Sequence, residues 1–164
     1  MQVEWPVINA SPLIFLASVN GLDWIAKIAT NPVTVPLGVR NEVAAGEGGS
    51  AIAAQIESDS RFYIAADVPL PDAIIAWDLG AGESQVLAHS LLRTDSSAIL
   101  DDKAARDCAK SLNLHVLGTL GIVMIAKRRG WIERVQPVVA HLRATGMFLS
   151  DVLVREVLRE MDEG

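Results

Sequence analysis

The sequence predicts an α/β fold in which a mostly parallel sheet is covered by helices on both faces. Five short apolar runs are each followed by a stretch with helical periodicity. Strand-then-helix repetition is typical of parallel sheets, because two parallel strands need a long crossover connection between them. The chain has no fixed-period repeat and no linker rich in proline, glycine and serine. We therefore expect residues 1–164 to form a single domain with three layers, α/β/α.

The first predicted strand is the apolar pair Val7-Ile8. Ser11 and Pro12 follow it, and we interpret them as a helix N-cap and the first helical residue. Serine is a preferred N-cap, and proline is favoured at the first helical position. The helix that they open carries apolar residues at helical spacing and ends near Gly21.

The second and third predicted strands are Val33–Val35 and Phe62–Ile64. Both consist of β-branched and aromatic residues, which favour strands. Pro36 closes the second strand and starts a helix that carries Glu42. The glycine-rich stretch from Gly46 to Ser50 predicts a loop between two helices.

A further helix opens at Gly82-Glu83. The fourth predicted strand, Ala98–Leu100, is followed at once by Asp101-Asp102 and a helix. The fifth strand, His115–Leu117, is followed by Gly118-Thr119 and another helix. The alternation of strand and helix therefore extends through most of the chain.

Composition excludes several classes of protein. The chain has 164 residues, 51% of them hydrophobic, and a formal net charge of −6, which argues against coating nucleic acid through bulk positive charge. One cysteine, Cys108, rules out an internal disulfide and fits a reducing compartment. The mean hydropathy of +0.31 is high, but no apolar run approaches the roughly 18 residues of a membrane span. With no signal-peptide pattern at Met1, we expect a cytoplasmic protein that does not bind membranes.

Polar side chains lie where a parallel sheet would gather them. Asn9 follows the first strand, Asp101-Asp102 follow the fourth, and Glu42 and Glu83 lie near the starts of helices. Ligands of open α/β sheets bind outside the carboxyl ends of the strands, and clustered carboxylates suit Mg²⁺ or Mn²⁺. The alternative interpretation is structural: Glu83 complements a helix dipole, Asp102 caps a helix, and Glu42 is solvated.

Several motifs together resemble the PIN-domain family. The run from Val7 to Ile14 resembles the family's opening strand, although the family has aspartate at the position of Asn9. The blocks 82–88 and 99–106 are similar to its third and fourth acidic motifs. Gly118–Gly121 and Ala126–Gly130 match one branch of prokaryotic PIN-like proteins. Each motif is weak alone, but their order and spacing are specific.

The resemblance, which extends from about Val7 to about Leu158, implies a PIN fold and a metal-dependent ribonuclease similar to VapC-type toxins. By motif position it implies Glu42, Glu83 and either Asp101 or Asp102 as catalytic acids. Asp101 is favoured as a metal ligand with Asn9, Glu42 and Glu83, because it directly ends its strand. The implied cofactor is Mg²⁺ or Mn²⁺.

Three further residues are candidates for contacting the substrate, each with a structural alternative. Ser11 would bond to the residue at position 9 or cap its helix. Arg106 would meet a substrate phosphate or a neighbouring acid. Thr119 would hold a pocket water or serve as a helix N-cap.

Asn9 leaves two functions open. Asparagine keeps the shape of aspartate but removes a full negative charge, which weakens cation binding. One hypothesis is therefore an active ribonuclease, held by an antitoxin protein in a toxin–antitoxin pair. The other is a catalytically impaired PIN-like binding or interaction module. A phosphoacceptor receiver domain, suggested by Asp101-Asp102, ranks far behind, because receivers carry their acidic pair after the first strand. RNA, an antitoxin and a second copy in a homodimer are the expected partners.

Overall fold

The computed structural model describes residues 2–164, and its sheet has five strands that all run parallel. The order across the sheet is β3-β2-β1-β4-β5. The strands are β1 (Trp5–Ile8), β2 (Val33–Pro36), β3 (Phe62–Ala65), β4 (Ser96–Ile99) and β5 (His115–Leu117). All five lie where the sequence predicted a strand, with small differences in their bounds.

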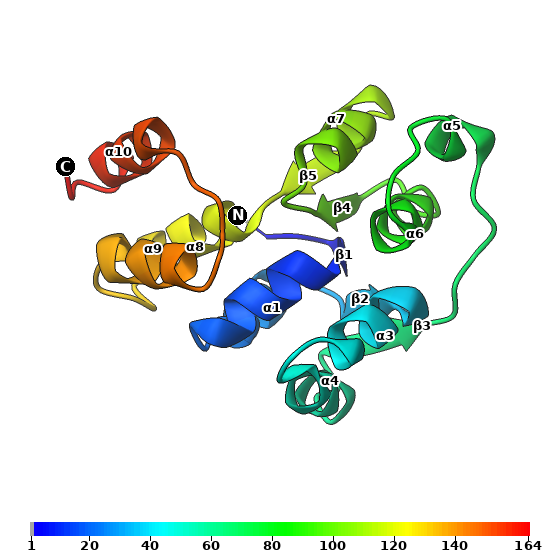
Figure 1. Ribbon diagram of the computed structural model, residues 1–164, viewed down its shortest axis with the longest axis horizontal. Helices are drawn as coiled ribbons and strands as arrows, with labels where there is room; N and C mark the ends of the chain where they lie inside the picture. Colours follow the sequence, from blue (N-terminus) through cyan, green and yellow to red (C-terminus); the bar gives the residue numbers. More distant parts are fainter. Residues whose placement is uncertain (1) are drawn as a thin grey trace.

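Ten helices of residues 2–164 connect the strands and follow the last of them (Figure 1). They are α1 (Ala10–Ser18), α2 (Leu22–Ile28), α3 (Leu37–Ala45), α4 (Gly49–Glu57), α5 (Asp72–Ile75), α6 (Ala81–Ser90), α7 (Lys103–Ser111), α8 (Thr119–Arg128), α9 (Val135–Ala144) and α10 (Asp151–Glu160).

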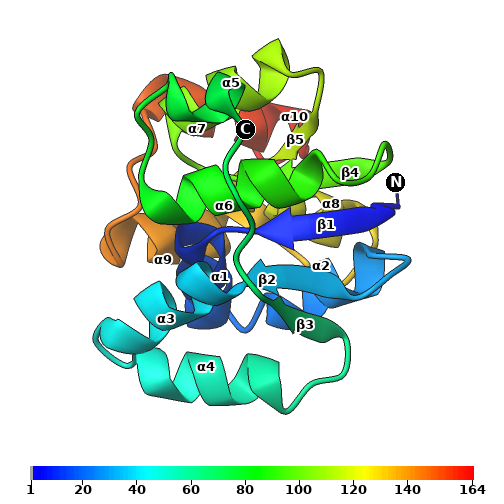
Figure 2. The same ribbon diagram turned by 90° about the vertical axis from the view of Figure 1, so that its right-hand side faces the viewer.

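The helices form a layer on each face of the sheet. Figure 2 shows α6 crossing one face, where it contacts β1, β2 and β4, while α5 and α7 pack beside it. On the other face, α1 and α2 pack against α8, and α9 packs against α8 in turn. The predicted α/β/α architecture is confirmed, and the sheet is wholly parallel.

Burial explains the layers. Strands β1, β2 and β4 lie inside the sheet and carry fully buried apolar side chains, among them Ile8, Val35 and Ile99. Because helices cover both faces, such strands have apolar residues on both sides instead of a strict apolar–polar alternation. Cys108 is a buried core residue on α7.

Helix α1 begins earlier than predicted. Asn9 occupies its N-cap position, with extended backbone angles of φ −87° and ψ 171°, and Ser11 and Pro12 both lie within its first turn. The interpretation of Ser11 as the N-cap is therefore wrong. Proline is tolerated there because the amides of the first turn have no intrahelical acceptor.

The order in which the chain adds strands to the sheet reverses between β1 and β4. Strands β2 and β3 extend the sheet on one side of β1, and β4 and β5 extend it on the other. The amide of Asn9 donates to the carbonyl of Ile99 at 3.1 Å, so the ends of β1 and β4 stay together. In an open parallel sheet such a switch point leaves a crevice at the carboxyl ends of the strands.

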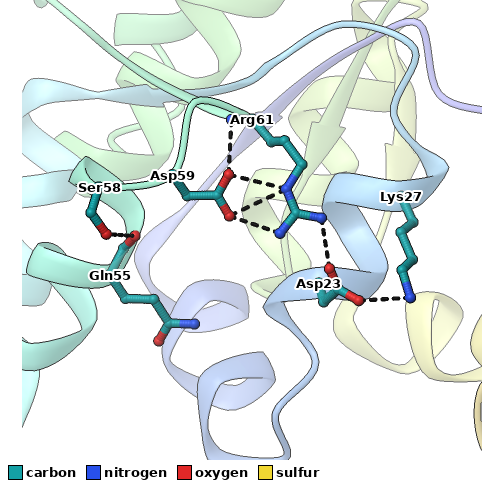
Figure 3. Close-up of polar contacts among 6 residues, drawn as sticks. All are labelled: Asp23, Lys27, Gln55, Ser58, Asp59 and Arg61. Carbon is teal, nitrogen blue, oxygen red and sulfur yellow. Dashed lines mark hydrogen bonds and ion pairs between the residues drawn. The ribbon is translucent and has the colours of Figure 1, made fainter.

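An ion-pair network fixes the opposite end of β3. Arg61 precedes this strand, and Figure 3 shows its guanidinium between Asp59 and Asp23 of α2. Its nitrogens lie 2.8 Å from Oδ2 of Asp59 and 2.6 Å from Oδ1 of Asp23, and Lys27 pairs with Asp23 as well. Hydrogen bonds from Lys27 and Arg61 lower the pKa of Asp23, and the bond from Arg61 lowers that of Asp59. The network joins the turn before β3 to α2.

Within residues 2–164, every helix is too short or too polar to span a lipid bilayer.

Candidate metal and phosphate site

Asn9 directly follows β1, at the switch point where β1 lies beside β4. Its side chain is only 3% exposed, and its Oδ1 accepts no hydrogen bond from any residue in 2–164. An N-cap asparagine usually accepts a backbone amide of the first turn, but Asn9 does not. A buried oxygen without a partner is rare in proteins, because its desolvation is uncompensated. Asn9 therefore presents an unused oxygen to the crevice.

Glu42 of α3 meets this oxygen at Gly82 of α6. A Cβ atom added to Gly82 would lie 2.8 Å from Oε2 of Glu42 and 3.0 Å from Oδ1 of Asn9. Two hydrogen-bond acceptors thus approach one small volume from different elements. Gly82 lets them do so, since any side chain at this buried position would fill the space.

Glu83 adds a second negative charge. It lies in the first turn of α6, half-buried, where its carboxylate also complements the helix dipole. Burial raises the pKa of Glu42, and the charge of Glu83 raises it further. The charged form of Glu42, a residue that is exposed overall, is therefore less favourable here than in a free glutamate.

Asp101 is held by the first residue of α8. Its Oδ1 accepts the backbone amide of Thr119 at 2.8 Å, and its Oδ2 accepts the hydroxyl of Thr119 at 2.6 Å. Thr119 is fully buried, and the N-cap of α8 is Gly118. The interpretation of Thr119 as a helix N-cap is wrong, because its hydroxyl donates to Asp101 and does not cap its own helix.

Arg106 of α7 lies beside Asp101 across Gly118. A Cβ atom on Gly118 would clash with Nη1 of Arg106 and lie 3.2 Å from Oδ1 of Asp101. Nη1 also donates to the carbonyl of Leu100 at 3.0 Å, which holds the guanidinium at the end of β4. The structure thus places a half-buried cation next to an acid at the switch point.

The remaining two candidates lie in structural positions. The carboxylate of Asp102 accepts the backbone amide of Ala105 at 2.9 Å and caps α7. Ser11 is exposed on the first turn of α1. Of the two adjacent aspartates, Asp102 is therefore used by its helix, while Asp101 faces the N-terminus of α8.

The oxygens of this crevice fit a hard divalent cation only in part. Asn9 and Glu42 supply two convergent oxygens and Glu83 a nearby charge, which are donors that Mg²⁺ and Mn²⁺ prefer. Within residues 2–164, no group of three or more His, Cys, Asp or Glu side chains is arranged to hold a metal ion. The set of carboxylates is incomplete because Asn9 supplies an amide oxygen in place of a carboxylate. Asp101, the acid after β4, accepts hydrogen bonds from Thr119.

Two glycines shape the site and were not identified as site residues from the sequence. Gly82 and Gly118 both lie within motifs that carry the family resemblance, directly before Glu83 and Thr119. A glycine beside an acidic or hydroxyl residue at a helix start is the only sequence signal, and it also fits simple helix entry. Only the packing of α3 and α7 against these positions shows that a side chain would not fit.

The protein is therefore an all-parallel α/β/α fold. Oxygen atoms suited to a cation, and an arginine, lie near its topological switch point. A family model described as a PIN domain matches residues 5–163, and the chain belongs to the PIN-domain family. The resemblance noted in the sequence is confirmed at this level. The PIN domain is a nuclease-type fold that generally uses divalent metal ions. A search of curated proteins finds no match to the chain.

Proposed function

We propose that this PIN-domain protein is a metal-dependent ribonuclease whose cation is Mg²⁺ or Mn²⁺. The observation that carries the proposal is the meeting of Asn9 Oδ1, buried and without a partner, with Oε2 of Glu42 at Gly82. Two acceptors side by side, near the charge of Glu83, repel each other. A divalent cation relieves this repulsion and gives Asn9 its missing partner.

In this proposal Asn9 and Glu42 hold the cation directly, and Glu83 contributes charge. When bound, the cation supplies a water of lowered pKa and neutralises charge on the phosphate. Asp101, oriented by Thr119 at the end of the neighbouring strand β4, would orient the attacking group. Arg106 binds the phosphodiester, because its guanidinium is held at the end of β4 by Leu100.

RNA is the proposed substrate, although the net charge of the chain is −6. Ten of the 14 basic residues follow residue 102, where they outnumber the 7 acidic ones. Residues 103–164 also contribute α7 and α8 beside the site. We extend the proposal to a toxin of a toxin–antitoxin pair that forms a homodimer. Exposed apolar side chains support a protein partner, among them Phe148, which is 92% exposed, and Val152.

The test compares metal binding and RNA cleavage in matched variants. We expect wild type to bind Mn²⁺ by calorimetry and to cut single-stranded RNA, and EDTA to abolish cleavage. Glu42→Gln should lose both activities. Glu47→Gln, in the exposed loop before α4, is the control that should retain both. Identical purification of the variants excludes a contaminating ribonuclease, and cleavage by Glu42→Gln at the wild-type rate would overturn the proposal.

A second candidate function is favoured by one residue. Asn9 stands where the family's pattern has aspartate, so the pocket lacks one negative charge. The chain would then be a PIN-like binding or interaction module with impaired catalysis. Asn9→Asp decides between the two: it should raise Mn²⁺ affinity in either case. Cleavage that appears only in Asn9→Asp would establish the module and exclude the native ribonuclease.

A further inference from the structure

A separate pocket of about 350 Å³ lies on the face of the sheet that α6 covers. It is formed at the C-terminal end of α6, whereas Glu83 lies in the first turn of this helix. Trp5, Phe62 and Tyr63 are among the residues that line it. Because side chains alternate along a strand, Tyr63 shares the face of Thr34 and Val7, and the buried Phe62 points to the opposite face. The pocket is therefore distinct from the acidic crevice at the carboxyl ends of the strands.

Two polar side chains in the lining of this pocket have no hydrogen-bond partner for a buried atom. His89 is 9% exposed and its Nε2 is unpaired, and Ser96 is 2% exposed and its Oγ is unpaired within residues 2–164. The neighbouring Ser90 is different, because its buried hydroxyl donates to the carbonyl of Val86 at 2.8 Å. Together with Asn9 Oδ1, these two are the buried unpaired side-chain atoms found among the described residues. Buried polar atoms that lack a partner need an explanation, and a bound ligand is one.

The charges around the pocket select the sign of the ligand. Arg93 stacks on the ring of Trp5, with its guanidinium carbon 3.8 Å from the ring centre, and both residues line the pocket. No aspartate or glutamate is among the lining residues that the structure describes. Burial lowers the pKa of His89, against smaller raising effects of the Ala66 backbone and Asp67. The pocket therefore favours an anionic ligand with a neutral polar edge.

The wall that faces this pocket is held in place. Ser60 and Phe62 of the lining flank Arg61, which Figure 3 shows bonded to Asp59 and Asp23. A site whose rim is fixed before binding loses less conformational entropy when the ligand arrives.

We propose that this pocket binds a nucleoside monophosphate. Trp5 and Tyr63 offer aromatic surface to a flat heterocycle, and Arg93 binds its phosphate. Small rotations of His89 and Ser96 bring their buried unpaired atoms to the donor and acceptor edge of the base. The volume is near the low end of small-molecule sites, roughly 300–1,000 Å³, and suits one base with one phosphate better than a dinucleotide. The nucleotide is either free or one residue of an RNA strand. The site does not depend on the ribonuclease proposal.

The test is calorimetric titration of the full chain in EDTA with AMP, GMP, CMP and UMP, and with inorganic phosphate as a separate probe. At least one mononucleotide should bind saturably, and phosphate alone should bind at least about tenfold more weakly. Ser96→Ala and Arg93→Gln should each weaken binding by about five- to tenfold, which is the loss of one hydrogen bond or more. Ser90→Ala, the matched buried serine outside the lining, should leave the affinity unchanged.

Stability measurements separate loss of the ligand site from loss of the fold. Ser96→Ala removes a hydroxyl that has no partner, so its urea midpoint should match or exceed that of wild type. Ser90→Ala removes a satisfied hydroxyl, so its midpoint should fall. Equal effects of the two variants on nucleotide affinity would overturn the proposal, as would the absence of mononucleotide binding or binding of phosphate as tight as that of the nucleotide.

A short RNA distinguishes the two sources of the nucleotide. A trinucleotide that binds tenfold more tightly than the best mononucleotide identifies an RNA residue, and equal affinities identify a free nucleotide. Glu42→Gln should bind the nucleotide as wild type does, because Glu42 contacts the crevice at the other end of α6. Loss of cleavage with retained nucleotide binding therefore separates failure of one proposal from failure of the other.

Discussion

Thr119 donates both its backbone amide and its hydroxyl to the two carboxylate oxygens of Asp101, at 2.8 Å and 2.6 Å. Two aspartates follow β4. Asp102 caps the next helix, α7, so Asp101 is the one that these bonds hold in place. They also join the end of β4, which lies beside the switch point, to the start of α8, which follows the edge strand β5. The orientation of Asp101 is therefore set by a helix that begins 18 residues later in the chain.

Thr119→Val should destabilise the fold and impair RNA cleavage. The change keeps the shape of the side chain but removes a short hydrogen bond to a carboxylate, which is worth about 1.5–3 kcal/mol. Urea unfolding measures the first effect and a cleavage assay the second. Thr145→Val is the control, because its exposed hydroxyl bonds only to carbonyls of its own helix. Equal losses in the two variants would contradict the role of Thr119.

Glu42→Gln should raise the thermal stability of the metal-free protein at pH 7.5. Burial and the charge of Glu83 raise the pKa of Glu42 above 4.5, so the folded state holds its proton more tightly than the unfolded state. The stability due to this group is complete below the unfolded pKa and is lost as pH rises through the folded pKa. The advantage of the variant should therefore shrink as the pH falls towards 4.5.

Thermal unfolding from pH 4 to 8 in EDTA measures this effect. Adding Mn²⁺ should stabilise wild type more than the variant, since ligands stabilise the state that binds them. A lower melting temperature for Glu42→Gln at every pH would show that Glu42 is a structural residue.

Gly82→Ala should preserve the fold and weaken Mn²⁺ binding by about tenfold or more. Alanine is the better helix former by about 1 kcal/mol, but its methyl group would lie 2.8 Å from Oε2 of Glu42 and 3.0 Å from Oδ1 of Asn9. Those oxygens must separate to accept it. Gly46→Ala is the matched control, since the nearest atom to its Cβ is at an ordinary 3.5 Å. Calorimetry with Mn²⁺ compares them, and unchanged affinity in Gly82→Ala would refute the site.

Glu163→Gln should lower stability by about 3 kcal/mol at pH 7. The carboxylate, 6% exposed, accepts the amides of Val135 at 2.7 Å and Gln136 at 2.9 Å and pairs with Lys127. Burial raises the pKa of Glu163, but these bonds together lower it more. Its contribution is therefore present above about pH 4.5 and is lost as the pH falls through the folded pKa.

Urea unfolding at pH 7 and at pH 3 tests this prediction, and the difference between Glu163→Gln and wild type should be smaller at pH 3. Glu160→Gln is the control, because its ion pair with Arg128 is exposed on both sides and is worth under about 1 kcal/mol. A similar cost for both substitutions would contradict the buried role of Glu163.

Local sequence patterns predicted the strands well because each strand is short, apolar and followed by a helix. The pattern predicted β5 with the bounds that the structure has, and β2 and β3 to within one residue. It placed the N-cap of α1 at Ser11, because serine and proline are strong local signals. In the structure Asn9 is the N-cap of α1, at the point where pairing with β4 ends the strand.

The role of a polar residue was harder to predict than its position. The sequence placed Asn9, Glu42 and Glu83 where they can converge, but no motif in it pointed to His89. The structure leaves Nε2 of His89 buried and unpaired, together with Oγ of Ser96 from β4. These atoms share a pocket because α6 lies across the sheet, a relationship that no local pattern encodes.

The sequence by itself determined the alternation of strands and helices, the family and the order in which the acids follow the strands. The reason is that periodicity and motif spacing are properties of neighbouring residues. Only the tertiary structure decided which oxygens meet and which are occupied: Asn9 and Glu42 at Gly82, and Asp101 at Thr119. Those two outcomes depend on hydrogen bonds and contacts between residues 18 to 73 positions apart.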